Sequence, residues 1–258
     1  MFEKLIKKLK EGISKDEFYN LTKEHYEGFD FNAIYDLMKF QGLPLTEING
    51  KIYLKTALIP YDEAEYTVVD LEVNNSKPKE GQAIEIGAVK IKNLKPVDEF
   101  SFLIKATDIP KYVTKVTGID EEMLKNEASQ KEILKKFRLF LGDSIFVAHA
   151  ADFDYNFLAK QFEKENLGEL LNRHLCTITL AEKTIEAQRY GLKYLKESLN
   201  LPNEVDHRAL GDARTTTRVF LKALENLPED IITAEDLIEF AQPKKNKCKK
   251  KKKNTKSN

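Results

Sequence analysis

The sequence predicts an α/β fold, a mixed sheet with flanking helices, preceded by a small α+β module. Three observations predict it. Apolar residues recur at helical spacing in the first 41 residues, an Asn-Gly turn then separates two short strand-like segments, and beyond residue 65 strand patterns come first and helical patterns follow. Strands that form a meander, followed by a strand with helices around it, favour a mixed sheet.

Residues 1–60 form the predicted module. Its three helices are expected at about 2–11, 15–27 and 30–41. The Asn49-Gly50 turn that follows is a strong hairpin signal. Three helices and a hairpin resemble a winged-helix module, which often binds DNA through its third helix. Here that helix carries Asp30 and Asp36 against one base, Lys39, whereas phosphate binding needs clustered cations, so a docking or structural role stays open beside DNA binding.

The main domain is expected at 65–226. Its strands are predicted at 67–73, 83–91, 99–105 and 145–149, and its helices at 108–124, 129–141 and 152–164. The chain from there to residue 226 is expected to be mostly helical. Residues 227–243 predict a short amphipathic helical extension, either core or a partner surface. Residues 244–258 form a lysine-rich tail that cannot bury a core and is expected to be disordered.

The formal net charge is zero, but the charge is unevenly distributed. Nine of the 42 basic residues lie in 244–258, which leaves 33 bases against 42 acids, a net charge of −9 for residues 1–243. One interpretation of the tail is an arm that contacts the phosphates of nucleic acid. A solubilising end or a contact with an acidic partner is the alternative.

Cysteine usage and hydropathy indicate the compartment. The two cysteines, Cys176 and Cys248, lie far apart, which argues against a disulfide framework. No segment is apolar enough to be a signal peptide or a membrane span. A cytoplasmic location is therefore expected.

Two acids, Asp70 and Glu72, end an apolar strand. Residues two apart on a strand point to the same face, so both carboxylates emerge side by side. Two like charges beside a buried strand are costly unless a cation lies between them, which indicates a metal site. Two solvated acids on an edge strand are the alternative.

A further acid, Asp154, lies on the first turn of the helix that follows the fourth predicted strand. Phe153, Phe157 and Leu158 are expected to anchor this helix on the sheet. Positions two apart on a helix face different directions, so Asp152 is interpreted as an N-cap or a surface acid rather than a partner of Asp154. Taken alone, Asp154 is also typical of the acids that favour a helix N-terminus.

A histidine, His207, precedes Asp212 by five residues at the start of another predicted helix. Histidine is the side chain whose reference pKa lies near neutrality, which suits removal of a proton from water. A purely structural histidine is the alternative, but two other acidic sites in the chain favour the catalytic interpretation.

Four segments occur in the order and approximate spacing of the DEDD exonuclease superfamily: VVDLE, IEIGAVKI, VAHAADFD and HRALGDA. The histidine of the last segment is typical of the branch with a catalytic histidine. Within that branch the chain resembles the proofreading epsilon subunit of bacterial DNA polymerase III. The likeness runs from about residue 65 to 226 and includes KVTGIDEEML. Each motif alone is weak, but four in order form a strong signal.

The resemblance implies a ribonuclease-H-like fold and a metal-dependent 3′–5′ exonuclease that releases nucleoside 5′-monophosphates. Two Mg²⁺ or Mn²⁺ ions would be held by four acids: Asp70, Glu72, Asp154 and Asp212. His207 would be the general base. Hard divalent cations prefer carboxylate oxygens, and two of them roughly 3.5–4 Å apart stabilise both the attacking and the leaving oxygen. The implied substrate is a single-stranded or frayed DNA 3′ end, and the implied partner is a DNA polymerase catalytic subunit.

Two departures from the family pattern concern substrate contacts. The family often has Asn after the histidine of its second motif, where this chain has Ala150 after His149. It also commonly has threonines beside the first acids, where this chain has Leu71 and Val73. Such polar side chains tend to contact the terminal nucleotide or support the site, so their absence affects affinity and specificity rather than metal binding.

The segment Gln-Gly-Leu-Pro-Leu resembles a sliding-clamp-binding pentapeptide, with Gln41, Leu43 and Leu45 as anchors. The alternative is a helix that ends at Gly42 and is followed by the first hairpin strand. A motif held inside a fold cannot extend into the groove of a partner.

Three functions fit the sequence. An exonuclease that proofreads with a DNA polymerase is favoured. An RNA-trimming exonuclease would use the same catalytic residues, because the chemistry acts on the phosphate and no residue for 2′-hydroxyl recognition can be located. A non-catalytic adaptor that recruits partners through the module and the tail is the third, and retention of all five expected catalytic residues disfavours it.

Overall fold

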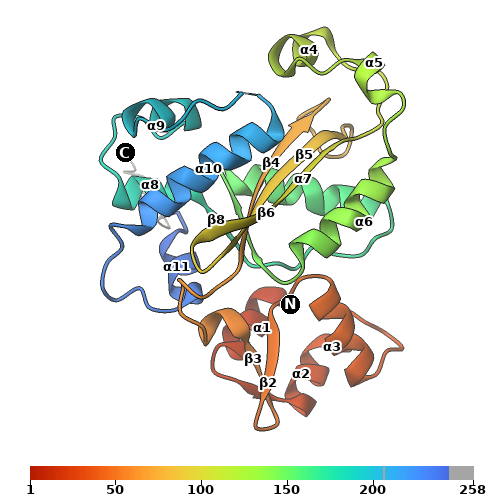
Figure 1. The fold of residues 1–258 in the computed structure, drawn as a ribbon. Coiled ribbons are helices and arrows are strands. Elements are labelled where there is room, and N and C mark those ends of the chain that lie inside the picture. The colour runs from red at the N-terminus through yellow and green to blue at the C-terminus, as the bar shows by residue number, and fades with distance from the viewer. Residues whose placement is uncertain (206, 244–258) are drawn as a thin grey trace, which may run out of the picture.

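The computed structural model describes residues 1–205 and 207–243, so the tail predicted at 244–258 lies outside the described residues. Two sheets organise the chain, one of three strands near the N-terminus and one of five strands (Figure 1). Within the described ranges, no helix is long and apolar enough to cross a membrane.

The N-terminal module contains the predicted helices and hairpin. Its elements are α1 (Phe2–Leu9), β1 (Ile13–Ser14), α2 (Lys15–Thr22), α3 (Phe31–Phe40), β2 (Leu45–Ile48), β3 (Lys51–Leu54) and the 3-10 turn η1 (Lys55–Ala57). Asn49 and Gly50 both have a positive φ, the backbone that a two-residue hairpin turn requires. The helix predicted at 15–27 ends at Thr22, and the short strand β1, which pairs with β3, was not predicted.

The larger sheet has the predicted mixed topology, with strand order β6-β5-β4-β7-β8. Strands β4, β5 and β6 are antiparallel, whereas β7 and β8 continue the sheet in parallel with β4. The strands are β4 (Tyr66–Val73), β5 (Ala83–Lys92), β6 (Lys95–Leu103), β7 (Ile145–Ala148) and β8 (His174–Cys176). Strand β8 lies in a segment expected to be mostly helical, because three residues are too few to show an alternating pattern.

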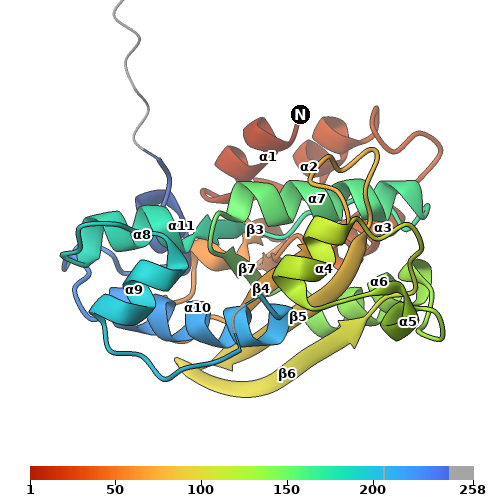
Figure 2. The ribbon, with the colours of Figure 1, turned by 90° about the horizontal axis from the view of Figure 1, so that it is seen from above.

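Helices cover both faces of this sheet. They are α4 (Lys111–Thr117), α5 (Glu121–Leu124), α6 (Gln130–Leu141), α7 (Ala151–Lys164), α8 (Thr177–Thr184), α9 (Leu192–Ser198), α10 (Ala209–Leu224) and α11 (Ala234–Phe240). Successive side chains of β4 point to opposite faces of the sheet and so contribute to two separate core clusters. Tyr66 and Val68 pack with Phe220 of α10, whereas Val69 and Leu71 pack with α6 and α7. Figure 2 shows α10 and α7 on opposite sides of β4.

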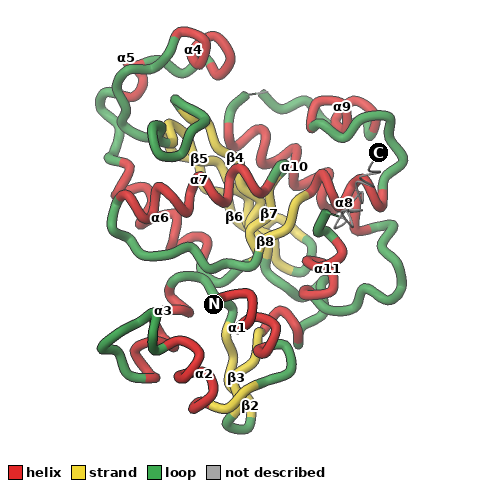
Figure 3. The backbone as a smooth tube through the Cα atoms, turned by 180° about the vertical axis from the view of Figure 1, so that it is seen from behind, coloured by secondary structure: helices red, strands yellow, loops and turns green. Residues whose placement is uncertain are grey.

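The N-terminal module lies at the end of the sheet where β4 begins, opposite α4 and α5 (Figures 1 and 3). The expected clamp anchors Gln41, Leu43 and Leu45 are only 4%, 1% and 2% exposed. The sliding-clamp interpretation is therefore wrong for this fold, because buried side chains cannot enter the groove of a partner.

Helix α11 belongs to the core of the main domain. Ala234, Leu237 and Ile238 are fully buried in the cluster that includes β4 and α10. The carboxylate of Glu235 accepts hydrogen bonds from Arg173 in the main domain and is therefore fixed to it. Of the two interpretations of residues 227–243, the structure favours core over partner surface.

Candidate active site

Asp70 and Glu72 continue the set of β4 residues that face α10. Both residues are half-buried near the end of the strand. Across the antiparallel pairing with β5, Asp70 lies opposite Gly87 and Glu72 lies opposite Glu85. The edge-strand interpretation of these acids is wrong, because β4 is a central strand with a neighbour on each side.

Asp154 comes from the first turn of α7 and is 5% exposed. Asp152 is exposed, as expected of a surface acid, but it is not the N-cap, which is Ala150. The predicted anchor Phe157 is fully buried, whereas Phe153 is 40% exposed. The helix is therefore held on the sheet by its later residues, and its first turn directs Asp154 inward.

Asp212 lies in the first turn of α10, and His207 lies just before that helix. The backbone N–H of His207 donates a hydrogen bond of 3.0 Å to Oδ2 of Asp212. His207 is exposed and has a φ of 58°, the left-handed region. One ligand atom from each of Glu72, His207 and Asp212 lies within 4.8 Å of the others. The fold thus brings together three predicted site residues that are widely separated in sequence.

Electrostatics link the remaining acids to this group. Burial raises the pKa of Asp70 well above its usual range, and four carboxylates raise it further: Asp154, Asp212, Glu72 and Glu85. Burial raises the pKa of Glu72 to about 7, with contributions from Asp212 and Glu85. Burial likewise raises the pKa of Asp154 to about 8, with a contribution from Glu72. Like charges that perturb one another in this way lie in one cluster.

The chemistry of this cluster fits divalent cations. Carboxylate oxygens are the ligands that Mg²⁺ and Mn²⁺ prefer, and a cation among the acids would relieve the repulsion that raises their pKa values. The candidate ligands are the four predicted acids: Asp70, Glu72, Asp154 and Asp212.

Two residues of the site were not predicted, Glu85 on β5 and Arg208 at the start of α10. Glu85 is 2% exposed, and its carboxylate accepts hydrogen bonds from the guanidinium of Arg208 and from the backbone of Ala209. The signal that could have found Glu85 is an acid inside an otherwise apolar strand, since such an acid needs a cationic partner.

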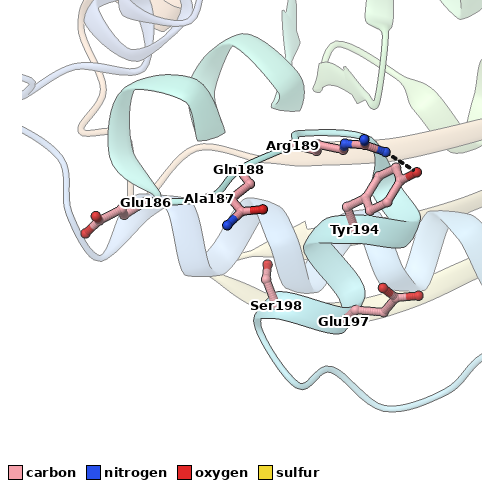
Figure 4. Close-up of a pocket in the computed structure, with 7 residues that line it drawn as sticks. All are labelled: Glu186, Ala187, Gln188, Arg189, Tyr194, Glu197 and Ser198. Atoms are coloured by element: carbon pink, nitrogen blue, oxygen red, sulfur yellow. Dashed lines mark hydrogen bonds between the residues drawn. The ribbon is translucent and has the colours of Figure 1, made fainter.

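A cavity of about 630 Å³ lies elsewhere, between the end of α8 and α9 (Figure 4). Arg189 donates a hydrogen bond of 2.7 Å to the hydroxyl of Tyr194 on one side of it. None of the predicted site residues lines this cavity, so the acidic cluster is a separate site.

A five-stranded mixed sheet flanked by helices, with an acidic cluster at one end, is the arrangement expected of a nuclease of the ribonuclease-H-like fold. The chain belongs to the exonuclease family, because the family profile described as "Exonuclease" matches residues 67–220. Members of this family depend on divalent metals.

Two curated relatives illustrate the similarity. The DNA polymerase III subunit epsilon of Aquifex aeolicus is 32% identical over 164 residues, which cover 63% of this chain and 81% of that protein. The PolC-type DNA polymerase III of Thermotoga maritima is 39% identical over 174 residues, which cover 67% of this chain. The match spans only 13% of that longer protein, so the chain corresponds to a small part of it.

Solved structures show the same fold. Exonuclease X in complex with 5′-overhanging duplex DNA has a TM-score of 0.56 at 22% identity, covering 69% of this chain and 99% of that one. Exonuclease I of E. coli in complex with a dA16 oligonucleotide has a TM-score of 0.57 at 12% identity, covering 64% of this chain and 42% of that one.

The metal-free protein is expected to lose stability as the pH rises from about 4 to about 8. Because the folded-state pKa values of Glu72 and Asp154 are raised to about 7 and about 8, the folded state binds more protons than the unfolded state across this window. The free energy of unfolding then falls as the pH rises through it. Urea denaturation at several pH values checks this, and Mn²⁺ should flatten the dependence. A metal-free curve that is already flat would contradict the raised pKa values.

Replacing Ala150 with asparagine is expected to stabilise the protein by about 1 kcal/mol, because Ala150 has a left-handed φ of 78° that asparagine tolerates better. The residue is exposed, so the larger side chain has room. Chemical denaturation measures the change. Ala150→Gly should also stabilise and Ala150→Val should destabilise, and a different order would show that backbone strain is not the cause.

Proposed function

We propose that this protein is a metal-dependent 3′–5′ exonuclease that releases nucleoside 5′-monophosphates and proofreads with a DNA polymerase. The observation that carries the proposal is the convergence of four acids from three elements beside His207. Such a cluster costs folding free energy when no cation neutralises it, and metal-dependent chemistry accounts for its presence.

Each residue has a proposed role. The four acids would hold the divalent cations, which would supply Lewis-acid stabilisation of the charge that develops on the phosphate. The imidazole of His207 removes a proton from the attacking water as general base. Because Asp212 accepts the backbone N–H of His207, one carboxylate links the metal ligands to the base.

DNA is the proposed substrate. The relatives above are DNA polymerase III proteins, and the two similar structures are complexes with duplex DNA and with a dA16 oligonucleotide. Fraying costs less at a mismatch, so mispaired or single-stranded 3′ ends should be cut faster than paired ends without any base-reading side chain. A DNA polymerase is accordingly the proposed partner and the cytoplasm the proposed location.

The test is digestion of 5′-end-labelled DNA and RNA of one sequence, single-stranded, paired or mispaired at the 3′ end. Mg²⁺ or Mn²⁺ should support stepwise shortening from the 3′ end, and excess chelator should stop it. Asp154→Asn should remove activity, whereas Asp152→Asn, an exposed acid in the same helical turn, is the matched control. Full activity in chelator would contradict metal dependence, and far faster cutting of RNA than DNA would replace proofreading by RNA trimming.

Deleting residues 244–258 is expected to weaken nucleic-acid binding and flatten its salt dependence without changing the chemical step. Residues 1–243 carry a net charge of −9 and repel a polyanion, whereas the deleted segment contains nine lysines. Affinity at several salt concentrations and the single-turnover rate measure the two effects. A variant with the same residues in scrambled order should bind like the wild type. An unchanged salt slope after deletion would assign the segment to another role.

A further inference from the structure

The first turn of α10 positions two of the proposed active-site residues, Asp212 within it and His207 just before it. The first backbone N–H groups of a helix lack partners inside the helix and are commonly satisfied by a side chain of the N-cap residue. Here the N-cap is Arg208, whose side chain makes no capping hydrogen bond. A group from outside the N-cap can therefore take this place.

Glu85 of β5 supplies it. Its carboxylate is 2% exposed, and its Oε2 accepts a hydrogen bond of 3.0 Å from the backbone N–H of Ala209, the first residue of α10. The guanidinium of Arg208 donates to the same carboxylate through Nη2 at 2.8 Å and through Nε at 3.2 and 3.3 Å. The buried acid is thus neutralised by Arg208 while it caps the helix.

Gly87, two residues further on the same face of β5, brings the helix close to the strand. A Cβ at this position would lie 2.1 Å from the backbone carbon of Ala209 and 2.1 Å from the backbone nitrogen of Leu210. Only glycine permits this approach, so the first turn of α10 rests directly on β5. The turn is then held at two points, by direct backbone contact and by the Glu85 carboxylate.

We propose that Glu85 and Arg208 are positioning residues that fix the first turn of α10, so that Asp212 and His207 face Glu72 in the geometry that metal binding and catalysis need. The inference rests on the proposed metal-dependent function. It assigns a function to two residues outside the four proposed metal ligands: they act through the backbone of α10.

The charge-neutral double variant Glu85→Gln/Arg208→Met tests this in the full-length protein. The net charge is unchanged and neither member of the ion pair is left without its partner. The repulsion of Glu72 by Glu85 and its attraction to Arg208 are removed together and have opposite effects on cation binding, so a loss of Mn²⁺ affinity reports mainly geometry. Isothermal titration calorimetry should show the Kd for Mn²⁺ raised roughly 10–100-fold, the usual effect of removing a group that orients a metal ligand. The single-turnover rate at saturating Mn²⁺ should also fall, because His207 is displaced together with Asp212.

Glu99→Gln/Arg214→Met is the matched control. This pair also joins a strand to α10, through hydrogen bonds of 2.7 and 2.6 Å, but both side chains are about 40% exposed. Its removal should leave the Kd for Mn²⁺ within roughly twofold of the wild type, because exposed ion pairs contribute little. An equal loss of affinity in both double variants would overturn the specific role of Glu85 and Arg208.

Arg208→Lys provides a second test if the double variant does not fold. It keeps the charge and loses the forked geometry, so it should weaken Mn²⁺ binding by a smaller factor. Wild-type Mn²⁺ affinity in a folded double variant, or in Arg208→Lys if the double variant does not fold, would overturn the proposal. A wild-type protein that binds Mn²⁺ but releases no nucleotide would refute the proposed function alone, since the affinity comparison still decides the positioning role.

Discussion

Replacing Asp70 with alanine is expected to abolish nucleotide release while stabilising the metal-free protein. Burial and four neighbouring carboxylates raise the pKa of Asp70 well above its usual range. Burial and the neighbouring carboxylates disfavour the ionised carboxyl in the folded state, whereas the unfolded chain ionises it freely, so folding at neutral pH costs free energy at this residue. The substitution removes that cost, and it also removes a proposed metal ligand.

Digestion of single-stranded DNA and thermal unfolding with and without Mn²⁺ measure the two effects. A gain of about 1 kcal/mol would raise the Tm by roughly 2–4 °C in a protein of this size. Asp70→Asn nearly preserves the volume and so separates the lost charge from a new cavity, and Asp98→Ala removes an exposed acid from β6 as a control. Cleavage that survives in Asp70→Ala would remove Asp70 from the proposed ligands. If Asp70→Asn destabilises the metal-free protein, repulsion between Asp70 and the neighbouring carboxylates does not cost folding free energy.

Elements with a periodic pattern could be predicted from the sequence. The mixed sheet and its flanking helices are confirmed, because long apolar segments such as Ala83–Lys92 identify central strands. Strand β8 was not predicted, because its three residues are too few to show the alternation of apolar and polar residues that identifies a strand. Phe153 was wrongly expected in the core: it is 40% exposed, whereas Ala151 and Asp154 of the same turn are buried, so Phe153 lies on the outer side of α7.

The candidate catalytic residues could be predicted from the sequence motifs, but the contacts that position them in the fold could not be predicted. Glu85 and Arg208 lie 123 positions apart, and only the packing of α10 on β5 brings them together. Sequence patterns report on neighbours within one element, whereas this pair joins two elements. Burial of the expected clamp anchors Leu43 and Leu45 likewise depends on tertiary packing, because both side chains lie in the core of the N-terminal module.

Replacing His207 with alanine is expected to lower the single-turnover rate roughly 10²–10⁴-fold, the usual contribution of a general base. Mn²⁺ binding should persist. The contact between His207 and Asp212 runs through the backbone N–H, which alanine retains, and the four proposed acidic ligands are untouched. The variant therefore separates proton removal from metal binding.

Single-turnover rates across pH, together with Mn²⁺ titrations, measure the two properties. Because the φ of residue 207 is 58°, alanine adds some backbone strain, and His207→Asn supplies a variant that tolerates this conformation. His25→Ala removes an exposed histidine from the N-terminal module and should leave the rate unchanged. If both His207 variants keep the wild-type rate at neutral pH, His207 is structural, and another group must accept the proton. If both instead lose Mn²⁺ binding together with the rate, the imidazole itself is a metal ligand, which its distance of at most 4.8 Å from the ligand atoms of Glu72 and Asp212 allows.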